Sequence, residues 1–142
     1  MKKGILGLLT AVLLMTGCSS NIKDGISYLE EGNYDKAIKY TDEGIALDSQ
    51  NPDLYRQKAI ALMLKKDFDG AKKELETGLG ISEYGVLYYT YLIAATEAGD
   101  TATVEKINTV LENAGLKNPE KIQNYLDGKL TYKEIFTEGT GD

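Results

Sequence analysis

The side chains that most often carry out catalysis are scarce in this sequence. Its 142 residues include no histidine, a single cysteine, Cys18, and a single arginine, Arg56. Histidine is the usual proton carrier near neutral pH, and a nucleophilic serine or cysteine needs such a base beside it. No G-x-S-x-G segment supplies another nucleophile. We therefore expect that the protein is not an enzyme.

Acidic side chains are the remaining candidates for chemistry. Glu30 and Glu31 are adjacent, and Glu74 and Glu76 are separated by one residue. Two carboxylates held close together could hydrolyse a glycosidic bond. Acids at this spacing are more typical of a solvated helix face, which is the interpretation that we prefer.

Two short motifs could indicate a bound metal or cofactor. Asp67 and Asp69 flank Phe68, but this stretch lies where a helix is expected to begin, so that Asp67 caps the helix and Asp69 meets its positive end. The Gly78-Leu79-Gly80 stretch is a lone G-x-G without the preceding strand of a dinucleotide-binding loop. We expect no metal and no cofactor.

The N-terminal segment has the features of an export signal. Lys2 and Lys3 give it a basic start, and residues 5–15 form an apolar run. This run is too short to cross a hydrocarbon core of about 30 Å as a helix. The sequence therefore predicts a signal peptide over residues 1–17.

The end of this signal, Leu14-Met15-Thr16-Gly17-Cys18, resembles the lipobox of bacterial lipoproteins. The resemblance implies that Cys18 carries lipid, such as palmitate, and becomes the first residue of the mature chain. The protein would then be anchored in the cell envelope outside the cytoplasm, either on the outer face of the cell membrane or on an outer membrane. The alternative is a plain signal peptide followed by an incidental cysteine.

The charge balance excludes one class of partner. Without Lys2 and Lys3 the chain keeps 14 basic and 22 acidic side chains, a formal charge of −8. Such a surface repels phosphate backbones and anionic head groups. We do not expect nucleic acid as a partner.

The sequence of the helices expected after the signal peptide repeats along the chain. The segment 68–81 aligns residue for residue with the segment 34–47. Related residues then coincide at seven positions: Tyr34 with Phe68, Asp35 with Asp69, Ala37 with Ala71, Lys39 with Lys73, Gly44 with Gly78, Ile45 with Leu79, and Leu47 with Ile81. A third, more divergent copy follows, in which Tyr88 takes the place of Tyr55. The repeating unit is therefore a pair of helices.

A period of about 34 residues, with small residues at its eighth, twentieth and twenty-seventh positions, resembles the tetratricopeptide repeat family. The resemblance covers residues 18–117 as three repeats. It implies an all-α fold, a right-handed α-solenoid of about three helix-turn-helix units. Asn21, Ser49, Glu83 and Leu116 depart from the family pattern at helix ends.

Local signals agree with these helices. Asn51 and Pro52 predict an N-cap and a first helical residue. The tyrosine-rich stretch 84–96 suits a strand by propensity, but Tyr88, Leu92 and Ala95 fall in helical phase, so we predict a helix there.

The region 118–142 is expected to form two capping helices and a tail. The first helix opens at Asn118-Pro119-Glu120 and ends before Gly128. The second starts at Thr131, with Glu134 completing a capping box. A solenoid end must cover its apolar face, and these helices would cover it.

The family resemblance implies a concave groove, lined by the first helix of each pair, that binds a protein or peptide. Carried over to this chain, the groove has a few polar groups among apolar side chains: Ile22, Lys23, Ile26, Leu29, Glu30, Asp53, Arg56, Gln57, Ile60, Met63, Leu64, Val86, Tyr89, Thr90, Ile93, Thr96 and Glu97. We expect the partner to contact Arg56, Gln57, Ile60, Met63, Tyr89 and Ile93. The alternative is that the C-terminal helices fold into the groove and make these residues part of the core.

These observations predict a lipid-anchored adaptor that binds a protein or peptide at the cell envelope. Only the short stretch 19–21 separates Cys18 from the first apolar helix residue, so the first repeat would hang within roughly 10–15 Å of the bilayer. The alternative is a carrier that holds an apolar small molecule or lipid between the repeats and the capping helices.

Overall fold

Helices form all the regular structure in the described part of the chain. The computed structural model describes residues 25–137, and no strand occurs in that range. Residues 25–30 are helical. The helices that follow are α2 (Tyr34–Leu47), α3 (Pro52–Leu64), α4 (Phe68–Ile81), α5 (Gly85–Glu97), α6 (Thr101–Asn113), α7 (Glu120–Leu126) and α8 (Tyr132–Thr137). The predicted all-α class is confirmed.

The second helix of each pair begins in the same way. Asn33, Asp67 and Asp100 cap α2, α4 and α6, and each accepts a hydrogen bond from the backbone N–H three residues later, at 3.4, 2.9 and 3.1 Å. These bonds pair an N–H group that the first turn of a helix leaves without a partner. The three caps coincide when the repeats are aligned, so the period in the sequence is also a period in the structure.

The turn before each of these caps also repeats. Gly32, Lys66 and Gly99 have φ angles of 75°, 66° and 70°, the left-handed region that ends many helices. In each turn the capping residue donates its N–H to a carbonyl five residues earlier, as Asn33 does to Tyr28 at 2.8 Å. The turns therefore reverse the chain in the same way three times.

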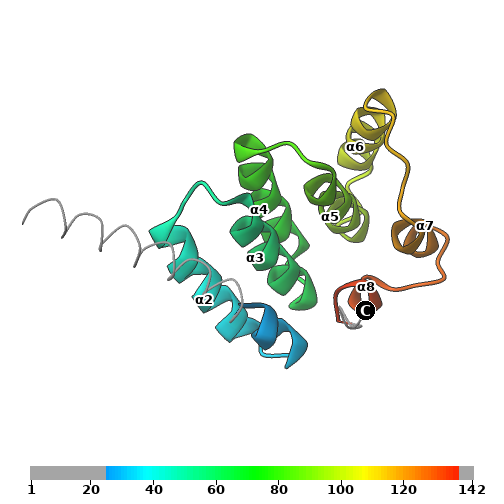
Figure 1. Ribbon diagram of the computed structural model, residues 1–142. Helices are drawn as coiled ribbons and strands as arrows, with labels where there is room; N and C mark the ends of the chain where they lie inside the picture. The colour runs from blue at the N-terminus through cyan, green and yellow to red at the C-terminus, as the bar shows by residue number, and fades with distance from the viewer. Residues whose placement is uncertain (1–24, 138–142) are drawn as a thin grey trace, which may run out of the picture.

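Small residues allow the helices to approach closely. Ala37, Ala59 and Ala71 are fully buried, and Gly44 and Gly78 are buried in α2 and α4. A Cβ atom on Gly78 would lie 3.4 Å from side-chain atoms of both α3 and α5. Each helix from α2 to α6 packs against the next one, and Figure 1 shows them side by side in chain order.

The tyrosine-rich stretch is a helix, as predicted. It forms α5, in which Leu87, Leu92 and Ala95 are fully buried. Tyr84 precedes this helix and makes no side-chain cap. The tertiary environment of a repeat thus overrides the strand propensity of the tyrosines.

The two C-terminal helices also form as predicted. The helix α7 starts after Pro119, and Gly128, with φ of 73°, follows its end. The capping box of α8 is present: Thr131 donates its N–H to Glu134 at 2.6 Å, and Glu134 donates its N–H to the Thr131 hydroxyl at 3.3 Å. In Figure 1 the chain runs from α6 through α7 and turns back at α8 toward the ends of α3 and α4.

Candidate functional site

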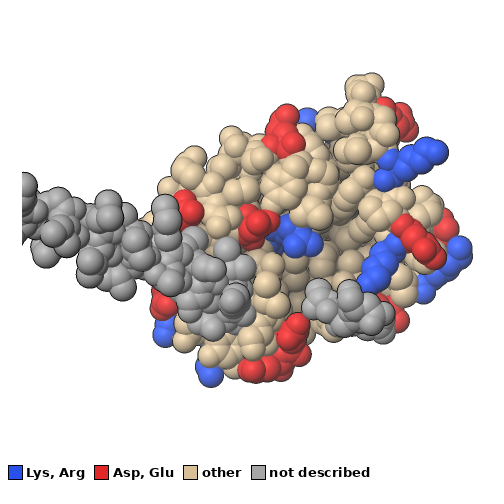
Figure 2. Space-filling view, in the orientation of Figure 1, with Lys and Arg blue, Asp and Glu red and all other residues tan. Residues whose placement is uncertain are grey.

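The predicted groove is formed where α3 and α5, the first helices of the second and third pairs, lie side by side. These helices contact each other directly. Figure 2 shows a hollow between them, with basic atoms at its base and an acidic group beside them. Of the residues predicted to line the first repeat, Ile22 and Lys23 lie outside the described residues, as does the lipidation candidate Cys18.

Arg56 is the polar centre of this region. Its Nε donates to the Thr90 hydroxyl at 3.0 Å, and that hydroxyl donates to the Val86 carbonyl at 2.8 Å. Burial lowers the pKa of Arg56, while Tyr84 and Asp53 act in the opposite direction. Within residues 25–137, Arg56 forms no ion pair. The guanidinium is therefore held in place without a carboxylate of its own.

Asp53 is the nearest acid to this guanidinium along α3, but Tyr84 engages it. The Tyr84 hydroxyl donates a hydrogen bond to the Asp53 carboxylate. Burial first, and then this carboxylate, raise the pKa of Tyr84 to about 12. Tyr84 thus remains a neutral donor at physiological pH and holds Asp53 at the margin of the groove.

The apolar residues predicted to line the groove are not open to solvent. Ile60 is 5% exposed, and Met63 and Ile93 are 0% exposed. All three belong to the main hydrophobic core together with Leu64. In this arrangement they are core side chains, which agrees with the alternative that the groove is covered.

The cover comes from α7 and α8. The Tyr132 ring of α8 meets the Phe68 ring edge-on, with centroids 5.5 Å apart. The Tyr125 hydroxyl of α7 donates to Glu97, a predicted groove residue, at 2.7 Å. Burial and then the Glu97 carboxylate raise the pKa of Tyr125. Ile122, Tyr125 and Tyr132 join the same core as Ile60 and Met63.

The other half of the groove, toward the N-terminal ends of α3 and α5, is more accessible. Asp53 is exposed, Val86 is 42% exposed, and Arg56, Gln57 and Tyr89 are half-buried. The Tyr89 hydroxyl donates to the Lys117 carbonyl at 2.8 Å, so the connection after α6 borders this surface. We call the surface formed by Asp53, Arg56, Gln57, Val86 and Tyr89 the open half of the groove.

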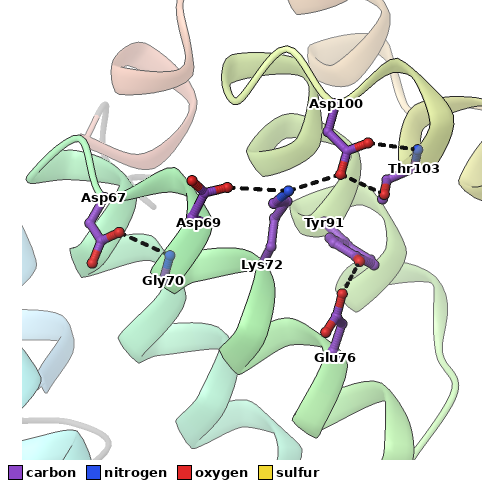
Figure 3. Close-up of polar contacts among 8 residues, drawn as sticks. All are labelled: Asp67, Asp69, Gly70, Lys72, Glu76, Tyr91, Asp100 and Thr103. Atoms are coloured by element: carbon purple, nitrogen blue, oxygen red, sulfur yellow. Dashed lines mark hydrogen bonds and ion pairs between the residues drawn. The ribbon is translucent and has the colours of Figure 1, made fainter.

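Polar links between neighbouring repeats were not predicted. Lys72 on α4 pairs with Asp69 at 3.3 Å and with Asp100 at 2.8 Å, and Asp100 also accepts from the Thr103 hydroxyl at 2.7 Å (Figure 3). The signal in the sequence was the acid at the cap position before α6, Asp100, because a capping carboxylate has a second oxygen available for a cation. Such a link joins α4 to the start of α6.

Most of the acids considered for catalysis or metal binding have structural partners. Glu74 pairs with Lys58, Glu76 accepts from Tyr91, and Asp67 caps α4 as predicted. Residues 25–137 contain no group of three metal-ligating side chains. In the same range, no helix has both the length and the apolar character needed to cross a bilayer.

Comparison with known proteins agrees with the repeat pattern. Residues 28–81 match the tetratricopeptide repeat family model. The comparison with curated proteins gives no match.

Two solved structures share the fold. One is the first tetratricopeptide domain of Spaghetti (RPAP3) bound to the HSP90 peptide SRMEEVD, with a TM-score of 0.70 and 23% identity, over 80% of this chain and 93% of that one. The other is the first tetratricopeptide domain of human RPAP3, with a TM-score of 0.69 and 22% identity, over 84% and 94% of the two chains. The chain therefore has a tetratricopeptide-type solenoid fold.

Proposed function

We propose that this protein is a lipid-anchored adaptor that binds a protein or peptide in the open half of its groove. The observation that carries the proposal is Arg56, which is desolvated, fixed by Thr90 and without an ion pair among residues 25–137. Asp53 offsets part of the cost of this desolvation without forming an ion pair, and a partner carboxylate paired directly with the guanidinium would compensate it further. A similar solenoid, 23% identical, is bound to a peptide.

The open half also provides apolar contact. Val86 is 42% exposed and lies one helical turn from the half-buried Tyr89, and tyrosine and arginine side chains are frequent centres of binding energy. A peptide with a carboxylate and a neighbouring apolar side chain would match this surface. Solenoids use their concave faces for such binding.

Site-specific photocrosslinking in cells tests this proposal. A crosslinker at Val86 should capture a partner, whereas one at Leu47, which is 46% exposed at the end of α2, should not. Arg56→Met should abolish the Val86 crosslink. Equal capture from both positions, or an unchanged crosslink in Arg56→Met, would remove the open half from the proposal.

Anchoring through Cys18 rests on the lipobox resemblance alone. Because Cys18 is the only cysteine, incorporation of a palmitate analogue into the chain can be assigned to it directly. The Cys18→Ser variant should not incorporate the palmitate analogue and should no longer be found in the membrane fraction. Retention of the label in that variant would contradict the proposed anchor and its place in the cell envelope.

The alternative function, a carrier of an apolar small molecule, is favoured by one cavity. It measures about 460 Å³ and is lined by Thr96, Glu97, Tyr125, Leu126, Leu130 and Tyr132, between α5 and the C-terminal helices. That volume suits a small ligand. Native mass spectrometry separates the two functions, because a carrier should retain a bound molecule through gentle purification.

A further inference from the structure

A second cavity lies on a different face of α5 from the groove. It measures about 360 Å³ and lies between α4, α5 and α6. Its walls combine apolar residues, two tyrosines and charged groups: Leu79, Ile107, Val110, Tyr88, Tyr91, Glu76, Glu83 and Lys106. Tyr91 follows the groove residue Tyr89 by two positions, a rotation of about 200° around a helix. A ligand here would therefore not compete with one in the groove.

The internal repeat shows what the equivalent place holds one repeat earlier. When the repeats are aligned, Lys58 falls on Tyr91, and Asp42 falls on Glu76. The Lys58 ammonium lies between two carboxylates, 2.8 Å from Asp42 and 3.0 Å from Glu74. We call the space between these helices, at the place that Lys58 occupies, the niche of the junction. At the junction of the first two repeats, the chain's own lysine fills it.

The second junction keeps one of the two carboxylates but lacks the lysine, because Glu76 takes the place of Asp42 and Ile107 takes the place of Glu74. Tyr91 replaces the lysine, and its hydroxyl donates to Glu76 at 2.6 Å (Figure 3). A hydroxyl pairs one oxygen of Glu76 without neutralising its charge. Within residues 25–137 no ion pair includes Glu76.

The second junction also has an additional acid. Tyr55 donates to the backbone carbonyl of Ser49 at 3.0 Å, and the equivalent residues one repeat later are Tyr88 and Glu83. The neutral serine is thus replaced by a glutamate at the edge of the cavity. Compared with the first junction, the niche has lost the cation of Lys58 and the carboxylate of Glu74, and it has gained the carboxylate of Glu83. Two carboxylates, Glu76 and Glu83, therefore remain without the lysine that lies between two carboxylates at the first junction.

Backbone and aromatic groups add to the preference for a cation. Leu79 and Val110 lie in the last turns of α4 and α6, and neither helix has a basic residue in its last turn. Helix C-termini carry partial negative charge, and tyrosine rings attract cations. Lys106 is the one basic group in the lining, and it forms no ion pair with the rest of residues 25–137.

We propose that this cavity binds a lysine side chain of a partner polypeptide. The ammonium lies between Glu76 and Glu83, and the methylene stem lies along Leu79 and Val110. The contact with Glu76 is equivalent to the one that Lys58 makes with Asp42 within this chain. It does not depend on the open half of the groove.

Methyl NMR spectroscopy of the full chain, in a non-ionic detergent, tests the proposal. N-acetyl-lysine methylamide is the probe, and N-acetyl-norleucine methylamide is the matched uncharged analogue. The lysine amide should shift the methyl signals of Leu79 and Val110, and the norleucine amide should not. Identical shifts from both probes would overturn the proposal.

Charge-removing variants identify the carboxylates that bind the ammonium group of the lysine amide. Glu76→Gln and Glu83→Gln should each weaken binding of the lysine amide about twofold to fivefold, the range of a partly exposed ion pair. Lys106→Met should strengthen it, and Glu105→Gln, on an exposed part of α6, should leave it unchanged. Undiminished binding to the Glu76→Gln, Glu83→Gln double variant would overturn the proposal.

Two further measurements complete the test. One asks whether the bound ammonium group belongs to a polypeptide, and the other asks whether the cavity binds independently of the groove. Binding of butylammonium without binding of the lysine amide would overturn the assignment to a polypeptide. Arg56→Met should leave the lysine amide bound as before, because that residue belongs to the groove. Loss of probe binding in Arg56→Met would overturn the separation of this cavity from the groove.

Discussion

Three residues at equivalent places in the repeats adopt the left-handed backbone conformation, and only one of them has a side chain. Gly32 and Gly99 have φ angles of 75° and 70°, and Lys66 has φ of 66° between them. A Cβ atom in this region clashes with the backbone at a cost of about 1–2 kcal/mol. The fold therefore accepts strain at Lys66 that its two counterparts avoid.

Replacing this lysine should stabilise the protein. Lys66→Gly is expected to raise the free energy of unfolding by about 1 kcal/mol, because glycine adopts this φ without strain. Gly32→Ala, the matched change in the opposite direction, should lower it by a similar amount. Urea unfolding followed by circular dichroism measures both variants. A destabilised Lys66→Gly variant would contradict the argument.

The carboxyl group of Asp100 should make stability depend on pH in the acid range. The Lys72 ammonium and the Thr103 groups lower the pKa of Asp100 from its ordinary 3.8 to about 2. A lowered folded-state pKa means that this contribution is present above pH about 4 and is lost as the pH falls toward 2. Asp100→Asn keeps a capping side chain but removes the charge. The variant should be less stable than the parent at pH 7 and equally stable near pH 2.

Urea unfolding at several pH values measures that difference. Glu112→Gln, an exposed acid at the end of α6, removes the same charge and is the control. The difference in the free energy of unfolding between Asp100→Asn and the parent should shrink as the pH falls. If it stays constant from pH 7 to pH 2, the ion pair with Lys72 is not its cause.

At the scale of the helix, two glycines of α4 offer a test of close packing. A Cβ atom on Gly78 would lie 3.4 Å from the Leu87 and Tyr55 side chains, whereas one on Gly80 would meet nothing within 4 Å. Gly78→Leu should therefore destabilise the fold by about 1–3 kcal/mol through overpacking. Gly80→Leu should not destabilise it, since leucine is the better helix former. Thermal unfolding compares the two, and equal losses would contradict the close approach at Gly78.

The sequence was informative about helices because their determinants are local or periodic. The caps Asn51 and Asp67 and the capping box at Thr131 were predicted from neighbouring residues and are confirmed. The helix α5 was predicted from repeat phase against its strand propensity, and it is confirmed. In each case the interacting groups lie within a few residues or one repeat of each other.

The groove was less predictable because its cover is neither local nor periodic. Ile60, Met63 and Ile93 occupy positions that the family resemblance assigns to a partner, but they are buried with α7 and α8. The contact between Phe68 and Tyr132 joins helices that no repeat relates. Only Arg56, Gln57 and Tyr89, of the six predicted contact residues, keep substantial exposed area in the structure.

For the whole molecule, the groove is divided into a covered half and an open half. The cover depends on two short helices, α7 and α8, that contact the repeats mainly through side chains such as Tyr125 and Tyr132. Segments with few buried contacts open locally at lower free energy than the core. We expect α7 and α8 to undock as a unit before the repeats unfold.

Removing the Tyr132 ring should make this undocking more frequent. Tyr132→Ala deletes a buried aromatic contact, and such deletions cost about 3 kcal/mol or more. Amide exchange in residues 120–137 should then accelerate at least about tenfold, while exchange in α2 and α3 stays unchanged. Tyr132→Phe keeps the ring and should behave like the parent. Equal acceleration throughout α2 to α8 would mean that the end helices and the repeats unfold together, and that the covered half of the groove never opens by itself.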